Sequence, residues 1–172
     1  MRSGLQQMIP TYAEVICAAL LSLGMPNADF ACTHMDTVVE VSEKYNLDPL
    51  VLTALIHVES RWTPRAKSRA GACGLTQVIP KFTRKFGYTG CRMLKRRPKL
   101  AISKGGQILS YWIKNYGKGS VKIGLCAYNA GYRCRGRHIE KGGIAYAKKV
   151  LNYSKEIYAH MVVGCKHCED SE

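Results

Sequence analysis

The chain has 172 residues, so it is long enough for one well-buried domain and too short for two of ordinary size. With 47% apolar and 22% charged residues it has a globular composition, which excludes a mainly disordered, collagenous or coiled-coil protein. The net charge is +14, and residues 61–172 carry 24 basic and five acidic side chains, so this part attracts a polyanion such as nucleic acid, an anionic membrane or an acidic cell-wall polymer.

The chain begins with a head, residues 1–34, whose apolar stretch 15–25 has the length of the hydrophobic region of a signal peptide. This stretch is too short to cross a bilayer. Because Glu14 directly precedes it and no small-residue cleavage pattern follows, we favour a packed amphipathic helix, and a cleaved signal peptide is the alternative.

The core, residues 35–161, reads almost entirely as helix, since no segment alternates as a half-buried strand would. We therefore expect a mostly α fold. Asp36 is expected to cap a first helix, and Asp48 followed by Pro49 is a strong start signal for a second. A polar, glycine-rich loop, 61–74, comes next. Further helices are predicted at 98–116, at 120–130 with Gly131 as the stop, and at 144–161. The pair Gly105-Gly106 inside the first of these indicates close helix packing.

The eight cysteines are an even number, which is typical of a protein from an oxidising compartment. Spacing does not select one pairing, but Cys73 with Cys91, which flank one loop and a short helix, is the pair that we expect first. In the tail, residues 162–172, Cys165 and Cys168 resemble half of a zinc site. A second pair at finger spacing is missing, so a disulfide is favoured there and no metal site is expected.

Glu59 is the candidate for chemistry on the second core helix. It follows Leu52, Leu55 and Ile56 on one helical face, so it continues an apolar stripe. Partial loss of water and the negative end of the helix dipole both raise the pKa of such a carboxyl, as a general acid requires. A frayed last turn with Glu59 in solvent is the alternative. His57 lies off this face and is expected to be structural.

Four motifs then follow in order: Glu59-Ser60, Gly74-Leu75-Thr76-Gln77, Ala127-Tyr128-Asn129-Ala130-Gly131 and Tyr146. Together they resemble the soluble lytic transglycosylases, lysozyme-like enzymes that cut bacterial peptidoglycan. The resemblance covers about residues 36–160 and implies a single compact, mostly helical, lysozyme-like (α+β) domain with a substrate groove and no cofactor.

The resemblance also implies roles for individual residues. Glu59 is similar to the single catalytic acid/base, Ser60 to the serine that helps to hold the site, and Tyr146 to a tyrosine whose hydroxyl approaches that acid. The implied sugar contacts are Gly74, Leu75 and Gln77 in a turn, and Tyr128 with Asn129 at the N-acetyl group and the bond to be cut. Thr76 departs from the usual Met of that turn, which puts the packing of a subsite in doubt. Without the resemblance, Gln77 could be a cap partner, Asn129 a residue before a stop glycine, and the tyrosines core aromatics.

The supply of carboxylates favours one reaction type. Most glycosidases use two carboxyl groups, but after Glu59 the next acidic residue is Glu140. This scarcity favours a one-acid reaction, and the resemblance to the soluble lytic transglycosylases implies that such a reaction gives a 1,6-anhydro product. Hydrolysis is the runner-up, with a base from Asp36, Glu40, Glu43 or Asp48.

The expected partner is the glycan strand of peptidoglycan, outside the cytoplasm, with a phage virion or a secretion machine as a possible larger assembly. No transmembrane segment and no specific nucleic acid are expected. The rival classes are a basic nucleic-acid-binding module and a structural module on an inactive lysozyme-like fold, and the retained Glu59 and Gln77 speak against the second.

Overall fold

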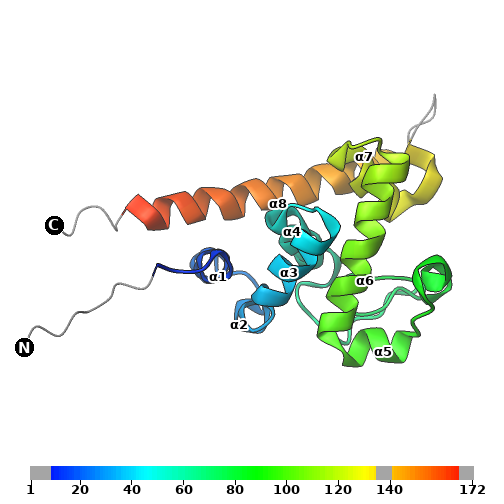
Figure 1. Cartoon of the computed structure of the whole chain (residues 1–172), viewed down its shortest axis with the longest axis horizontal. Coiled ribbons are helices and arrows are strands. Elements are labelled where there is room, and N and C mark those ends of the chain that lie inside the picture. The colour runs from blue at the N-terminus through cyan, green and yellow to red at the C-terminus, as the bar shows by residue number, and fades with distance from the viewer. Residues whose placement is uncertain (1–8, 135–140, 167–172) are drawn as a thin grey trace, which may run out of the picture.

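The computed structural model of the chain describes residues 9–134 and 141–166 (Figure 1). Within these ranges the secondary structure is helical apart from two isolated β-bridges, Lys67 with Cys73 and Cys73 with Val78. The predicted mostly α fold is therefore confirmed. In chain order the helical elements are α1 (Tyr12–Ser22), α2 (Ala28–Cys32), α3 (Met35–Tyr45), α4 (Pro49–Ser60), the 3-10 helix η1 (Pro80–Phe86), α5 (Cys91–Arg96), α6 (Pro98–Tyr111), the π-helical turn η2 (Trp112–Tyr116), α7 (Val121–Ala130), the 3-10 turn η3 (Gly131–Cys134) and α8 (Lys141–Lys166).

Two helix starts agree with their sequence signals and one does not. Asp48 accepts a hydrogen bond from the Leu50 N–H at 2.7 Å, with Pro49 as the first helical residue of α4. Ser120 likewise caps α7, which ends at Gly131 as predicted. The prediction that Asp36 caps α3 is wrong. Only Thr33 and His34 separate α2 from α3, so α3 has already begun before Asp36. The Asp36 carboxylate lies in the first turn of α3, where it interacts favourably with the positive end of the helix dipole.

Two other predicted helices, 98–116 and 144–161, exist with changed ends. The segment expected as one helix over 98–116 is α6 followed by the π turn η2, so the helix loosens at Trp112. Helix α8 is longer than expected and runs across one side of the molecule, where it packs against α1, α4 and α7 (Figure 1). Helix α8 therefore connects the head of the chain with the helices of the core.

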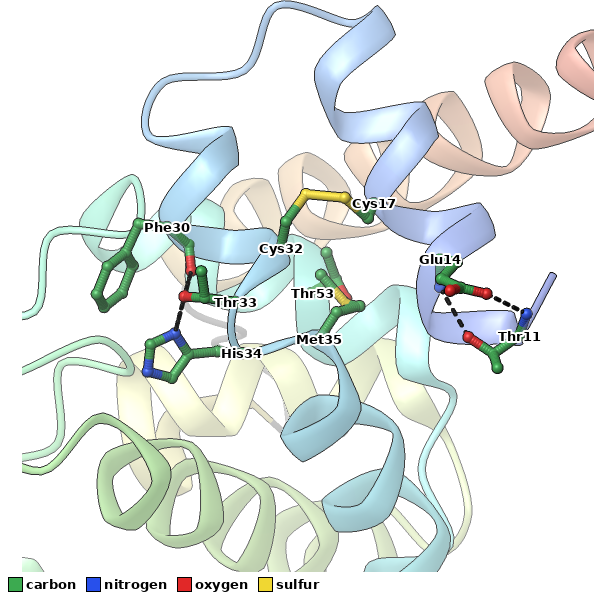
Figure 2. The surroundings of a disulfide bond; sticks show 9 residues. All are labelled: Thr11, Glu14, Cys17, Phe30, Cys32, Thr33, His34, Met35 and Thr53. Carbon is green, nitrogen blue, oxygen red and sulfur yellow. Dashed lines mark hydrogen bonds between the residues drawn. A yellow bond between two sulfur atoms is a disulfide. The ribbon is translucent and has the colours of Figure 1, made fainter.

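The head contains a packed helix, as favoured. In α1, Ile16 and Leu20 are fully buried, and Thr11 and Glu14 form a reciprocal capping box at its start (Figure 2). Glu14, directly before the apolar stretch, thus orders the first turn of the helix. A disulfide from Cys17 to Cys32 ties α1 to α2 (Figure 2).

The expected disulfide between Cys73 and Cys91 is present, and a third joins Cys126 in α7 to Cys134 in η3. Cys168 and the side chain of Cys165 lie outside the described residues, so the expectation for the tail stays a prediction. Over the described ranges, His, Cys, Asp and Glu side chains form no group that could hold a metal ion. In the same part of the chain, no helix is both long enough and apolar enough to span a bilayer.

Candidate active site

Glu59 lies in the last turn of α4, where the helix ends sharply. Arg61 has a left-handed backbone with φ 49°, and its carbonyl accepts a hydrogen bond from Asn27 Nδ2 at 2.8 Å. The next residue, Trp62, is fully buried, so the chain is anchored directly after the helix. The chain directly after Glu59 is therefore anchored, and the frayed-turn alternative is wrong.

A tyrosine from α8 fixes the carboxyl group. The Tyr146 hydroxyl donates a hydrogen bond to Glu59 Oε1 at 2.6 Å, and both side chains are partly buried. Burial raises the pKa of Glu59 from its ordinary value of 4.5 to about 7, although the hydrogen bond from Tyr146 opposes the shift. Near neutral pH both the protonated and the ionised form of this carboxyl are therefore accessible, so it can both donate and accept a proton.

A second tyrosine, Tyr128 of α7, belongs to the same electrostatic environment. Burial and, secondly, the charge of Glu59 raise the pKa of both Tyr128 and Tyr146 well above the usual value for tyrosine. Both phenols therefore stay protonated and serve as neutral hydrogen-bond donors. The Tyr128 hydroxyl donates to the carbonyl oxygen of Thr76 at 2.7 Å, which joins α7 to the turn 74–77.

Thr76, which departs from the family pattern, faces the interior. Its side chain is fully buried and its hydroxyl donates to the Ala101 carbonyl of α6 at 2.9 Å. A Cβ atom at Gly105 would lie only 2.4 Å from Thr76 Cγ2, so glycine is needed for this approach. The second glycine, Gly106, is packed equally closely against Val41 of α3, which confirms the close packing predicted from the Gly-Gly pair. The threonine thus fits against α6 instead of lining a groove.

The remaining residues of this turn divide between site and core. Leu75 is fully buried, so the expectation that it contacts sugar is wrong for its side chain, which belongs to the hydrophobic core. Gly74 is required because α5 approaches it: a Cβ there would lie 2.4 Å from the Leu94 carbonyl oxygen, at φ 75°. The close approach is therefore made by protein and not by a ligand. Gln77, partly buried, donates from Nε2 to the Gly74 carbonyl at 2.9 Å and closes the turn.

Ser60 and Asn129 occupy the edges of this arrangement. The Ser60 hydroxyl donates to the Ile56 carbonyl within α4 at 3.2 Å, so it stabilises the turn that holds Glu59. Asn129 is exposed near the end of α7, adjacent in sequence to Tyr128. His57 is buried and its ring lies 4.7 Å from that of Tyr153, with burial lowering its pKa, as expected of a structural histidine.

The geometry places one acid, two phenols and one rigid turn together from α4, α7, α8 and the loop between α4 and η1. The family model for the transglycosylase SLT domain matches residues 36–151, which include all of these groups. The chain belongs to this family. The match leaves α1 and α2 outside, although α1 packs against α3 and α8, and the disulfide from Cys17 to Cys32 ties α2 to α1.

Two curated relatives and two solved structures agree with the match. The chain is 32% identical over 96 residues to a transglycosylase of Enterobacteria phage PRD1, covering 56% of this chain and 34% of the relative. It is 30% identical over 111 residues to membrane-bound lytic murein transglycosylase C of Glaesserella parasuis, covering 57% of this chain and 30% of the relative. The matched part thus spans about a third of these relatives.

The solved structures show the fold. The 70 kDa soluble lytic transglycosylase of Escherichia coli matches with a TM-score of 0.65 at 21% identity, over 91% of this chain and 31% of that one. An inactive mutant of lytic transglycosylase Slt from Pseudomonas aeruginosa matches with a TM-score of 0.56 at 20% identity, over 92% and 31%. The lysozyme-like, mostly helical single domain expected from the motifs is thereby confirmed.

The sequence motifs do not include one group of aromatic side chains in the SLT domain. Tyr111, Trp112 and Tyr116 at the end of α6 and in η2 contact Tyr132 of η3 or one another through their rings. The available signal was the density of aromatic residues in 111–116, but their contact with Tyr132 depends on tertiary structure.

Proposed function

We propose that this domain cuts the β-1,4 bond between N-acetylmuramic acid and N-acetylglucosamine in peptidoglycan by transglycosylation, with Glu59 as the single acid/base. The observation that carries the proposal is a partly buried Glu59 with a pKa of about 7, bonded to Tyr146, in a member of the transglycosylase SLT family. Peptidoglycan as substrate is supported by the relative that is named a lytic murein transglycosylase.

In the proposed reaction Glu59 first donates one proton to the substrate and then takes one proton from it. Neutral Glu59 protonates the glycosidic oxygen, the bond from that oxygen to C1 of the muramoyl sugar breaks, and the acetamido oxygen of the same sugar stabilises C1. The Glu59 carboxylate then removes the proton of the C6 hydroxyl, whose oxygen bonds to C1. The product is a 1,6-anhydro sugar, no water is consumed and Glu59 is neutral again. Tyr146 stabilises the carboxylate that forms between the two steps.

The distribution of carboxylates supports one acid over two. Retaining and inverting glycosidases need a second carboxyl within roughly 5–10 Å of the first. Asp48 begins α4 and Glu59 is near its end, so 11 residues of helix separate them by about 16 Å. Asp36, Glu40 and Glu43 are exposed on α3. Among the described residues, no other carboxylate contributes to the pKa shift of Glu59, and Glu140 lies outside them.

Product analysis tests the reaction type. Purified peptidoglycan digested in ¹⁸O-water should give anhydro ends without ¹⁸O, and mass spectrometry separates them from reducing ends, which have gained one water. Reducing muramic acid ends labelled with ¹⁸O would favour the hydrolytic alternative. Glu59→Gln should form neither product, and full activity of this variant would exclude Glu59 as the acid.

We further propose that the domain acts outside the cytoplasm, as part of a phage particle or a secretion machine that opens the wall. The three disulfides in the described part of the chain support an oxidising environment, and one relative comes from a phage. The basic part of the chain would attract anionic wall polymers, so cleavage of intact sacculi should fall as salt rises. Cleavage that does not change with salt would contradict this electrostatic attraction to the wall. Tight binding to DNA at physiological salt would favour the nucleic-acid alternative instead.

A further inference from the structure

Three aromatic rings meet where the π turn η2 contacts the 3-10 turn η3. The ring centroids of Trp112 and Tyr132 are 5.0 Å apart, and Tyr116 lies 5.6 Å from each of them, all in edge-to-face arrangements. Tyr132 is nevertheless 71% exposed. An exposed ring that is held by two others differs from an ordinary surface tyrosine, because its position is fixed before any ligand arrives.

The backbone around these rings is fixed as well. The Tyr116 hydroxyl donates to the Tyr132 carbonyl at 2.5 Å, and the disulfide from Cys126 to Cys134 ties η3 to α7. On the other side, η2 is pressed against α7, because a Cβ at Gly124 would lie 2.3 Å from the side chain of Ile113. A ligand that uses this surface therefore has little conformational entropy to remove from it.

The aromatic surface continues toward η1. Tyr111 contacts Trp112 at 5.7 Å and Phe86 at 5.3 Å, and Lys85 Nζ donates to the Tyr111 hydroxyl at 2.6 Å. That hydrogen bond is the main reason why the pKa of Tyr111 is lowered, and the Tyr132 hydroxyl contributes to the same shift. Polar groups thus border the rings and can bond to hydroxyls of a ligand.

This surface adjoins the candidate active site. Tyr132 follows Asn129 by three residues, so their Cα atoms are at most about 11 Å apart. A polymer that contacts Asn129 at the end of α7 is therefore close enough to contact Tyr132 as well. Sugar rings present apolar C–H faces, whose hydrogens are attracted to the negative face of an aromatic ring, while their hydroxyls bond to polar groups at the edge.

We propose that Trp112, Tyr116 and Tyr132 form a platform on which a sugar ring of the glycan strand stacks, beyond the bond that is cut. This inference rests on the proposed function, since it assigns a further part of the same polymer to the same domain. Tyr132 supplies the contact face, and Trp112 and Tyr116 position it.

Binding in a catalytically inactive background tests the platform. Soluble, amidase-treated glycan strands, which lack stem peptides, are titrated into Glu59→Gln and into Glu59→Gln/Tyr132→Ala by calorimetry. The loss of one stacking contact should raise Kd about 3- to 10-fold. Tyr132→Phe should bind like the parent, because it keeps the ring.

The matched control is Tyr88→Ala, since Tyr88 is 67% exposed in the loop between η1 and α5 and should not change Kd. Equal Tm values establish that the variants are folded. Unchanged affinity of the Tyr132→Ala variant would overturn the platform alone, as would an equal loss for Tyr88→Ala. A loss seen only with strands that carry stem peptides would assign the surface to peptide and overturn it too. If the Glu59→Gln parent binds no glycan, the proposed function itself fails, and the platform falls with it.

Discussion

Replacing Glu59 by Gln should make the protein more stable while it removes activity. The side chain keeps its size and an oxygen that can accept the hydrogen bond from Tyr146. The substitution removes an ionisable carboxyl from a partly buried site, where the pKa of Glu59 is raised from 4.5 to about 7. At about 1.4 kcal/mol for each pKa unit, ionised Glu59 costs the folded state about 3 kcal/mol, and somewhat less because water reaches part of the side chain.

The sign of the pH dependence follows from proton binding. The unfolded chain loses the proton of Glu59 near the ordinary pKa of 4.5, but the folded protein holds it until about 7. Between these values the folded state binds more protons, so this group lowers stability as pH rises, and the loss is complete above the folded pKa. His57, whose pKa is lowered by burial, acts in the opposite direction below its ordinary value of 6.5, and it does so equally in both proteins. The difference between variant and wild type therefore isolates Glu59.

Urea unfolding at about pH 4, 6 and 8 measures this difference. The free energy of unfolding of Glu59→Gln relative to wild type should rise by about 2–3 kcal/mol from the lowest to the highest pH. Glu43→Gln, an exposed carboxyl on α3, is the control and should show almost no change. A difference for Glu59→Gln that stays constant with pH would refute the reasoning, because it would mean that Glu59 ionises as it does in water.

Three further predictions concern the surroundings of this acid. Tyr146→Phe removes the hydrogen bond that holds the pKa of Glu59 down, so the basic limb of the pH profile of kcat/KM should move above about 7. Activity should also fall roughly tenfold. Tyr158→Phe, at an exposed position on the same helix, is the control and should change neither the profile nor the activity. Gly105→Ala should cost about 1–3 kcal/mol in urea unfolding because of its clash with Thr76, and Gly90→Ala, whose Cβ would be 3.8 Å from its nearest neighbour, should cost clearly less; equal losses would contradict this. Replacing Cys73 and Cys91 together by Ala should lower stability by about 2–4 kcal/mol and raise KM, because the turn 74–77 follows Cys73 directly; an unchanged KM would mean that the turn does not need the bridge.

Helix α4 shows what local sequence signals can predict. Asp48 and Pro49 define its start through groups within one turn, and the apolar face that ends in Glu59 has the period of a helix. These signals are short-range, so the position and partial burial of the acid followed from sequence. Asp36 shows the limit of the same reasoning, since α3 begins two residues before the position at which Asp36 could cap it.

The turn 74–77 shows why a motif does not assign side-chain directions. Residues in a turn have no repeating period, so sequence cannot separate those that face the groove from those that face the core. Leu75 and Thr76 are both fully buried, and the glycine at 74 serves the packing of α5. The contact between η2 and η3 was beyond prediction for a related reason, because it depends on a π turn that shifts the register of Trp112 and Tyr116.

The acidity of Glu59 is therefore a property of packing between helices rather than of α4 alone. Tyr146 comes from α8, and Tyr128 of α7 is held by a carbonyl of the turn, which is itself fixed by Thr76 against α6. Burial by these packed elements raises the pKa of the carboxyl and lowers the stability of the folded protein at neutral pH, whereas the hydrogen bond from Tyr146 acts in the opposite direction. The disulfide beside the turn and the close packing at Gly105 offset that loss. A substitution that stabilises the protein by removing the ionisable group at position 59 must therefore also remove the proton on which cleavage depends.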